Sequence, residues 1–360
     1  MKATAGGTSP MIHLDGISKV YGDFTALHQT EIRVRRGEFL TLLGPSGSGK
    51  TTILNLISGA VGATAGRIFI DGRDVTAVPA RERGIGMVFQ NYALMPHMSV
   101  FDNIAYPLKI RKLPKKEIVN KVQDVLARVG LTGFEARKPR QLSGGQQQRV
   151  GIARCIVYSP KIILMDEPLG ALDKNMRDQM QEEIKRLHTE LGTTIVYVTH
   201  DQEEALNLSD AVCLMENGRV GQIGPPEELY FAPVSTFAAQ FIGESNLFDV
   251  VPVGDGLLRA PDGTTFRPAR SATLGNKVLV RPEKLRIISE ERLPAGGVNT
   301  LSGEVDHVSF VGGMTRVTVR TANGTTFVAK GISERAALRV RPGDRLHVAW
   351  DDSDVILLSG

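Results

Sequence analysis

The stretch FLTLLGPSGSGKTTILNLIS, residues 39–58, decides the fold of this chain. Its first five residues are almost wholly apolar, which is typical of a strand buried on both faces in a parallel sheet. Gly44–Thr51 then fits the pattern G-x-x-x-x-G-K-[ST], and an apolar helix is expected over Ile53–Ser58. A strand, a glycine-rich loop and a helix in this order predict an α/β fold.

The glycine-rich loop has the chemistry of a phosphate-binding site. Its glycines let backbone N–H groups surround a phosphate chain, and the start of the helix adds partial positive charge. Lys50 can reach the outer phosphates, and the Thr51 hydroxyl can ligate Mg²⁺. The loop therefore predicts a nucleotide-binding site made of Gly44, Pro45, Ser46, Gly47, Ser48, Gly49, Lys50, Thr51 and Thr52.

A pair of carboxylates follows a second apolar strand. Ile162–Met165 predicts the strand, and Asp166 and Glu167 come directly after it. Ligands of open α/β sheets bind at the carboxyl ends of the strands. We therefore expect Asp166 to hold the Mg²⁺ shell and Glu167 to be the catalytic base that polarises the attacking water. The alternative is an acid pair at a strand end that only solvent surrounds.

The segment Leu142-Ser-Gly-Gly-Gln146 opens a predicted helix that runs to about Val157. A Ser-Gly-Gly sequence at a helix N-terminus can bind an anion. Since residues 44–51 already hold the phosphates of one nucleotide, this second device is expected to contact the γ-phosphate of ATP held by a neighbouring chain. A helix cap without further function is the alternative. The residues concerned are Ser143, Gly144, Gly145 and Gln146.

Three further side chains are candidates for the same site. Gln90 and His200 each follow an apolar strand segment, so both are expected at the sheet edge where Asp166 lies. Gln90 can then ligate Mg²⁺ or its water, and His200 can contact the γ-phosphate. Tyr21 can stack on adenine, and a place in the core is the equal alternative.

The pattern of the chain changes after Gly243. Residues 12–243 alternate apolar runs with helical stretches, and a mostly helical insertion spans about residues 91–160. Residues 244–360 contain short alternating segments separated by turns, which predict an all-β domain. Residues 1–11 predict a disordered tail. We therefore expect an α/β domain followed by a smaller all-β domain.

Two turn sequences in the second domain are nearly identical. RAPDGTTF, beginning at Arg259, recurs 61 residues later as RTANGTTF, beginning at Arg320. A Val-Arg-Pro sequence recurs as well, at Val280 and at Val340. The Asp-Gly and Asn-Gly pairs predict type I′ hairpin turns. A duplicated β unit is expected, with chance similarity of turns as the alternative.

Composition excludes several classes of protein. Hydrophobic residues make up 42% of the chain and charged residues 23%, which is enough for a globular core and excludes a mainly disordered chain. No apolar run reaches the roughly 18 residues of a membrane-spanning helix, and no signal peptide is evident. The net charge of +4 does not favour a nucleic-acid partner. Cys155 and Cys213 are too few for a disulfide framework or a metal cluster and predict buried thiols.

Taken in order, these motifs resemble those of the ATP-binding subunit of an ABC transporter. The Walker A, Q-loop, signature, Walker B, D-loop and H-loop motifs correspond to Gly44–Thr51, Gln90, Leu142–Gln146, Ile162–Glu167, Leu172-Asp173 and His200. The resemblance covers about residues 12–240. It implies a P-loop NTPase (ABC ATPase) fold with a helical insertion, ATP and Mg²⁺ as cofactors, and Tyr21 as the adenine-stacking residue. Residues 245–360 resemble the OB-like, TOBE-type regulatory domain of bacterial importer ATPases.

The resemblance also implies partners. It predicts a homodimer of ATPase chains docked under two integral-membrane permease subunits at the cytoplasmic face of the bacterial inner membrane. A periplasmic solute-binding protein would act indirectly. The surface around Tyr92–Leu108 is expected to receive the permeases, although its apolar residues can equally belong to the core. These residues are Leu94, Met95, Met98 and Phe101.

Three longer strings bear on the transported solute. LDKNMRDQMQ from Leu172, THDQEEA from Thr199 and VRPEKLR from Val280 look most like the spermidine/putrescine branch of the importers. Ferric-iron, sugar and phosphonate importers share similar strings and stay as alternatives. A soluble ABC ATPase acting on nucleic acid is the remote alternative, and we expect no nucleic-acid partner. Cys155 stands where the family usually has a small or aliphatic residue, and no function is assigned to it.

Overall fold

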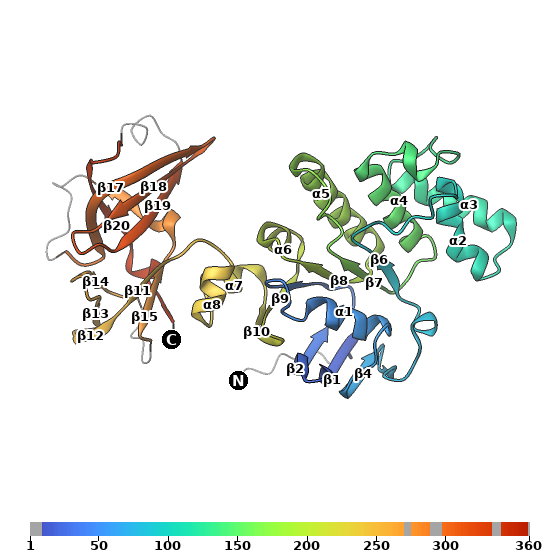
Figure 1. Ribbon diagram of the computed structural model, residues 1–360, viewed down its shortest axis with the longest axis horizontal. Coiled ribbons are helices and arrows are strands. Elements are labelled where there is room, and N and C mark those ends of the chain that lie inside the picture. The colour runs from blue at the N-terminus through green and yellow to red at the C-terminus, as the bar shows by residue number, and fades with distance from the viewer. Residues whose placement is uncertain (1–8, 270–274, 289–296, 333–339, 359–360) are drawn as a thin grey trace. The chain divides into compact units, whose positions relative to one another are not determined.

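The computed structural model describes residues 9–269, 275–288, 297–332 and 340–358 (Figure 1). The chain divides into two compact units, Met1–Pro226 and Glu227–Gly360. Each unit has hydrophobic core clusters of its own, so each is described separately. Within the described ranges, no helix is both long enough and apolar enough to cross a membrane.

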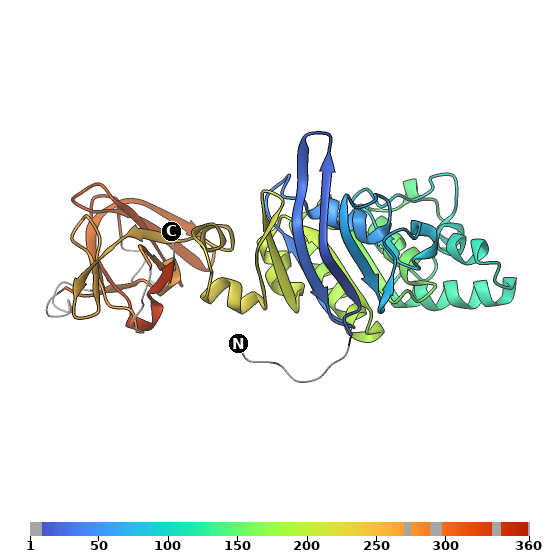
Figure 2. The same cartoon turned by 90° about the horizontal axis from the view of Figure 1, so that it is seen from below.

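Two sheets form the framework of the first unit. The larger has six strands in the order β10-β9-β3-β8-β7-β6, and the smaller has four in the order β2-β1-β4-β5. Strands β9 to β6 of the larger sheet run parallel, whereas β10 is antiparallel to β9. Figure 2 shows the long hairpin of β1 and β2 in blue. The strands are β1 Ile12–Tyr21, β2 Phe24–Val34, β3 Phe39–Leu43, β4 Ala65–Ile70, β5 Arg73–Asp74, β6 Gly86–Val88, β7 Ile162–Asp166, β8 Thr194–Thr199, β9 Ala211–Glu216 and β10 Arg219–Gly224.

Strands β3, β7 and β8 are buried on both faces, as their sequences predict. Successive residues of a strand point to opposite faces. In β7, Ile162 and Leu164 therefore join the core that contains helix α1, and Ile163 and Met165 join the core under the helical insertion. Helix α1 contacts β2, β7 and β8. The carboxyl ends of β3, β7 and β8 consequently meet at one edge.

Helices dominate residues 91–160. Helices α2, α3 and α4 pack on one another, and α3 buries the apolar face that its sequence predicts. The buried side chains of α3 are Ile118, Val122, Val125 and Leu126. The helices of this unit are α1 Lys50–Ser58, α2 Val100–Ile110, α3 Lys115–Arg128, α4 Gly144–Ile156, α5 Lys174–Leu191 and α6 Gln202–Leu208, with short 3-10 helices η1 Ala80–Glu82 and η2 Pro139–Gln141.

The second unit is built of antiparallel strands and begins with two short helices. Its three sheets have the orders β11-β15-β21, β12-β13-β14 and β16-β20-β17-β18-β19. Phe266 and Phe327, at equivalent positions of the two repeated sequences, are both buried in one core with Trp350. The elements are α7 Pro226–Phe231, α8 Thr236–Phe241, β11 Asn246–Asp249, β12 Val251–Gly254, β13 Leu257–Arg259, β14 Thr265–Phe266, β15 Lys277–Val280, η3 Pro282–Lys284, β16 Arg286–Ile288, β17 Thr300–Val311, β18 Met314–Arg320, β19 Thr326–Ile332, β20 Arg345–Ala349, η6 Asp352–Asp354 and β21 Ile356–Leu358.

The two repeated turns share their hydrogen bonds, but they are not type I′ turns. In both, the glycine N–H donates to the carbonyl three residues earlier, at 2.9 Å for Gly263 and 3.0 Å for Gly324. These glycines have φ of +91° and +84°, whereas the preceding Asp262 and Asn323 have no positive φ. Each is a type I turn with glycine in its last position. The type I′ prediction was wrong because it placed Asp262 and Asn323 in the left-handed region.

The compact units divide earlier than the predicted boundary at residues 243 and 244. Helices α7 and α8 belong to the second unit, where Arg281 holds them. Arg281 is only 1% exposed and donates to the Tyr230 and Ala239 carbonyls, both at 2.9 Å. Local sequence gives no sign of this attachment, because the bonded residues are 51 and 42 positions apart.

Met11 does not belong to a disordered tail, although the prediction for residues 1–11 included it. Residues 1–8 lie outside the described residues. Met11 is 2% exposed, and its N–H donates to the Val34 carbonyl at 2.8 Å. Met11 therefore belongs to the first unit.

A chain ended after Pro226 should retain nucleotide binding, because every residue predicted to touch phosphate lies before Asp201. A chain ended at Gly243 should bind too, but it should aggregate more, since α7 and α8 lose the Arg281 bonds. Titration with a fluorescent ATP analogue and size-exclusion chromatography measure both effects. Native circular dichroism without ATP binding by the shorter chain would contradict this division of the chain.

Candidate functional site

The loop between β3 and α1 lies at the carboxyl edge of the parallel sheet. Two of its glycines stand where a side chain has no room. A Cβ at Gly44 would lie 2.3 Å from the Met215 carbonyl oxygen, and one at Gly49 would lie 2.9 Å from the Ala26 carbonyl oxygen. Gly49 also has a φ of +98°. The tight turn that a phosphate-binding loop requires therefore depends on these glycines.

The Lys50 side chain folds over this loop. Its Nζ donates to the carbonyls of Gly44 at 2.8 Å and Pro45 at 2.9 Å, and the residue is 5% exposed. Burial lowers the pKa of the Lys50 ammonium, and the nearby Glu167 and Asp166 carboxylates oppose that shift. A cation held here with few competing waters is suited to binding phosphate oxygens.

Asp166 is the last residue of β7 and lies beside the first turn of α1. The Thr51 hydroxyl donates to its Oδ1 at 3.4 Å. Burial, reinforced by the neighbouring Glu167, raises the pKa of Asp166, so a cation would stabilise its ionised form. A hydroxyl and a carboxylate are ligands that Mg²⁺ accepts. The described residues contain no group of three His, Cys, Asp or Glu that could hold a metal ion.

Glu167 is the centre of the site. Gln90 Nε2 donates to Glu167 Oε2 at 3.4 Å, and His200 Nδ1 lies 3.2 Å from Oε1. The structure therefore brings together the three side chains that the sequence placed at this edge. Glu167 has a φ of +43°, which costs about 1–3 kcal/mol in a residue other than glycine. Its N–H donates to the Val198 carbonyl of β8 at 3.0 Å, which helps to hold this backbone in place.

Sequence reasoning missed Glu204, a buried acid that bonds to the strand that ends just before His200. Glu204 is 3% exposed and accepts hydrogen bonds from the hydroxyls of Tyr197 and Thr199, both at 2.8 Å. Thr199 is the residue before His200, so Glu204 fixes the end of β8. Burial raises the pKa of Glu204, and the two hydroxyl bonds oppose that shift. The signal in the sequence is an acid next to Ala205 on the buried side of a short helix.

Arg177 joins the residue that follows His200 to the segment that leads into α5. Its Nη1 lies 3.1 Å from Asp201 Oδ2, directly after His200, and its Nη2 donates to the Leu172 carbonyl at 3.3 Å. Asp201 also accepts from two backbone N–H groups at the start of α6. This link was missed because nothing in a helix pattern shows that one of its arginines reaches Asp201, 24 positions away.

Ser143 caps helix α4. Its hydroxyl accepts from the Gln146 N–H at 3.3 Å, and the Gln146 Oε1 accepts from the Ser143 N–H at 3.0 Å. Ser143 therefore does cap the helix, which was the alternative given for this segment. In the described part of the chain, no hydrogen bond or ion pair joins residues 143–146 to residues 44–52, and α4 lies in the helical insertion (Figure 1).

Tyr21 lies at the end of β1 and is not part of the core. Its side chain is 48% exposed, and Lys19 Nζ lies 4.8 Å from the ring centroid. Phe24, its partner across the β1–β2 hairpin, is 66% exposed. An exposed ring can stack on a base, so the alternative of a core tyrosine is wrong. Phe24 is a second exposed ring that the sequence reasoning missed.

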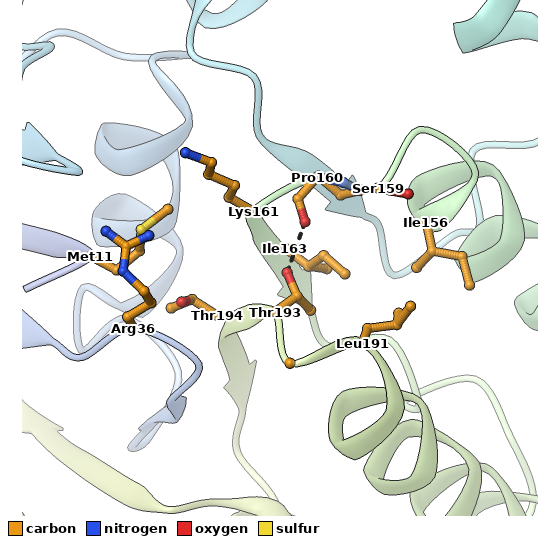
Figure 3. A pocket seen from close by; sticks show the side chains of 11 residues that line it. Met11, Arg36, Ile156, Ser159, Pro160, Lys161, Ile163, Leu191, Thr193 and Thr194 are labelled. Carbon is orange, nitrogen blue, oxygen red and sulfur yellow. Dashed lines mark hydrogen bonds between the residues drawn. The ribbon is translucent and has the colours of Figure 1, made fainter.

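A pocket of about 260 Å³ lies before the amino ends of β3, β7 and β8, at the opposite edge (Figure 3). Arg36 and Lys161 border it, and both pair with Asp71. Thr193 Oγ1 donates to the Pro160 carbonyl at 2.9 Å, drawn as a dashed line. None of the predicted site residues lines this pocket. The candidate site is therefore the carboxyl edge.

Cys155 and Cys213 are free and buried, as predicted. Burial raises the pKa of each thiol to about 12, which leaves both groups uncharged and weakly reactive.

Comparisons with family models agree with both units. The model described as ABC transporter matches residues 27–170, and the model described as TOBE domain matches residues 278–358. The first match covers the loop at Gly44, the capped helix at Ser143 and the carboxylate at Glu167. The second covers most of the β-stranded unit.

Two solved structures resemble the first unit. CbiO1 from Clostridium perfringens, described as part of an ABC transporter complex, matches 65% of this chain and 93% of its own at 29% identity, with a TM-score of 0.59. A dimeric ATP-binding cassette, MJ0796, bound to ADP and Pi after hydrolysis, matches 60% of this chain and 99% of its own at 33% identity, with a TM-score of 0.55. Both support the ABC ATPase fold.

Curated relatives match almost the whole chain. The spermidine/putrescine import ATP-binding protein PotA of Rubrobacter xylanophilus is 43% identical over 98% of this chain and 95% of its own length. The protein of that name from Nitratidesulfovibrio vulgaris is 44% identical over 97% and 98%. The Fe(3+) ions import ATP-binding protein FbpC 1 of Rhizobium meliloti is 41% identical over 96% of both chains. This chain therefore belongs to the family of ATP-binding subunits of ABC import systems.

Proposed function

We propose that this chain hydrolyses ATP to drive import of a polyamine, spermidine or putrescine, through a membrane ABC transporter. The observation that carries the ATPase assignment is the position of Glu167. Its carboxylate lies between Gln90 and His200, beside the loop of Lys50 and the carboxylate of Asp166. A carboxylate in this position can orient a water for in-line attack on a phosphate.

Each residue of the edge has a role in this proposal. The loop N–H groups and the Lys50 ammonium bind the phosphates of ATP. Mg²⁺, when bound, neutralises charge on those phosphates, and Thr51, Asp166 and Gln90 would hold it or its waters. Glu167 accepts a hydrogen bond from the attacking water and takes its proton. His200 orients Glu167 and donates toward the γ-phosphate.

The signature residues act on the ATP of a second chain in this proposal. One observation supports it: Ser143 opens helix α4, and the N-terminus of a helix carries partial positive charge that favours an anion. A homodimer would then bury two ATP molecules, each between Lys50 of one chain and Ser143 of the other.

A mixture of two damaged chains tests this shared site. Homodimers of Lys50→Ala and of Ser143→Arg each carry two damaged sites. In a mixed dimer, both lesions fall in one site and the other is whole. With Glu167→Gln in both chains to block hydrolysis, mixing should restore about one tightly held ATP per heterodimer, measured as nucleotide retained on a desalting column.

Two controls accompany this experiment. Heterodimer formation is established separately with two affinity tags, so that absent ATP is not confused with absent pairing. If confirmed heterodimers trap no more ATP than the homodimers, Lys50 and Ser143 act within one chain and the shared site is refuted.

We further propose that two integral-membrane permeases dock on the face that joins β6 to α2. A groove of about 340 Å³ there is lined by Phe89, Met95 and Tyr106, and the rings of Phe89 and Tyr106 are each 41% exposed. Met95 therefore fits the predicted docking surface. Leu94 and Phe101 instead pack partly against the core, which is the alternative weighed for them. Met98 is half-buried, without being part of that groove.

The names of the relatives support the polyamine assignment, and ferric iron is the alternative that one of them supports. The chain would sit at the cytoplasmic face of the inner membrane, held there by the permeases, with a periplasmic solute-binding protein acting through them and no nucleic acid involved. The permease and solute-binding protein that purify with this chain identify the solute: a pocket of carboxylates indicates a polyamine.

A further inference from the structure

The segment after Gln90 has a strained backbone. Tyr92 and Ala93 are consecutive and have φ of +57° and +46°, a left-handed conformation that residues with a Cβ rarely adopt. Such residues persist only where the surrounding structure holds them. The question is therefore which group holds this turn.

One arginine of helix α4 holds it. Arg154 Nη2 donates to the Tyr92 carbonyl at 2.9 Å, and Nη1 donates to the Ala93 carbonyl at 2.7 Å. Both carbonyls of the strained turn are thus bonded to one guanidinium, and burial lowers the pKa of Arg154. The planar guanidinium presents two N–H groups in a fixed fork, which fits two adjacent carbonyls better than an ammonium does.

The same turn lies along α4 toward its signature end. The Tyr92 carbonyl lies 3.6 Å from the place where a Cβ of Gly151 would be. The Tyr92 hydroxyl lies 3.5 Å from the corresponding place at Gly144, the residue after Ser143. Tyr92 therefore spans α4 from Arg154 to the residues expected to meet ATP.

We propose that Arg154 is a positioning residue that fastens the strained turn at Tyr92 and Ala93 to the signature helix, so that Gln90 and Ser143 move as one body. The inference rests on the proposed function, because it concerns how the proposed ATP contacts are kept in register. Arg154 also borders the groove of Phe89 and Tyr106. A partner seated in that groove would press on the residue that joins Gln90 to Ser143.

The test uses the full chain with Glu167→Gln and follows the dimer that forms with ATP and Mg²⁺, by light scattering. Arg154→Ala should weaken this dimer about tenfold, because the released turn leaves its strained conformation. ATP binding to the monomer should stay within about twofold, since Lys50 and its loop are untouched. The dimer affinity of Arg154→Lys should lie between those of the parent chain and of Arg154→Ala, because lysine keeps the charge but lacks the two-pronged guanidinium.

Rescue by glycine separates positioning from a general structural role. Ala93→Gly removes the cost of the left-handed conformation at Ala93, one of the two strained residues, so the double variant Arg154→Ala/Ala93→Gly should recover part of the dimer. The matched control is Arg83→Ala. Arg83 is also partly buried and donates to backbone carbonyls, those of Val78, Leu56 and Ile57, away from this turn. Ala93→Gly should not improve Arg83→Ala.

The outcomes are distinct. If the parent Glu167→Gln chain forms no dimer with ATP, the proposed function fails before Arg154 is tested. If the parent dimerises and Arg154→Ala dimerises equally well, or if Ala93→Gly gives no recovery, the positioning role of Arg154 is overturned. Should Arg154→Ala be poorly folded by circular dichroism, Arg154→Lys with and without Ala93→Gly gives the same comparison.

Discussion

Replacing Glu167 by Gln is expected to slow ATP hydrolysis by about 10²–10⁴-fold while ATP stays bound. The amide keeps the size of the side chain and its place between Gln90 and His200. It cannot take a proton from water, so the nucleotide-bound dimer should accumulate. Phosphate release measures the first effect, and size-exclusion chromatography with ATP measures the second.

A matched control for this variant is Glu190→Gln. Glu190 lies on α5 and pairs with Arg186 at 2.8 Å, away from the site. Its turnover should equal that of the parent chain. Near-normal turnover by Glu167→Gln would show that another group acts on the water.

Replacing Lys50 by Ala is expected to weaken ATP binding about 100-fold or more, because it removes a charged hydrogen-bond donor from a buried position. The Gly44 and Pro45 carbonyls also lose the donor that they share. Calorimetric titration with ATP and Mg²⁺ measures the loss. Hydrolysis should fall with binding, which distinguishes this variant from Glu167→Gln.

Lys161→Ala is the control for charge alone. Lys161 borders the pocket at the opposite edge of the sheet and pairs with Asp71 at 3.0 Å. Removing it changes the net charge by the same amount and should leave ATP affinity unchanged. If both variants lost affinity alike, a general charge effect would replace the assigned role of Lys50.

The nucleotide edge could be predicted because its determinants are local in sequence. A strand, a loop and a helix lie within residues 39–58, and the strand that ends at Asp166 is apolar up to that residue. Parallel strands bring their carboxyl ends to one edge, so Glu167 and His200 were expected near each other. The distance of 3.2 Å between His200 Nδ1 and Glu167 Oε1 agrees with that expectation.

What could not be predicted depends on residues far apart in the chain. Arg281 bonds to carbonyls 42 and 51 positions away, and Arg154 to carbonyls 61 and 62 positions away. An arginine in a sequence shows its charge and not its partner. The attachment of α7 and α8, and the clamp on the turn at Tyr92, therefore emerged only from the fold.

The prediction of type I′ turns was wrong for a different reason. Asp-Gly and Asn-Gly suit type I′ turns, yet they also suit a type I turn that ends in glycine. In the first copy Pro261 precedes Asp262, and its fixed φ favours the type I form. The sequence thus held the discriminating residue, which the dipeptide rule ignores.

The left-handed backbone of Glu167 lowers the stability of the fold at the residue that hydrolysis needs. Asn or Gly would adopt that φ at lower cost, and neither has a carboxylate to act on water. A library of variants sorted only by melting temperature would therefore enrich inactive chains at this position. Directed evolution of this protein for heat resistance therefore has to select for hydrolysis in every round. Otherwise the selected chains will lose the Glu167 carboxylate and gain a less strained backbone.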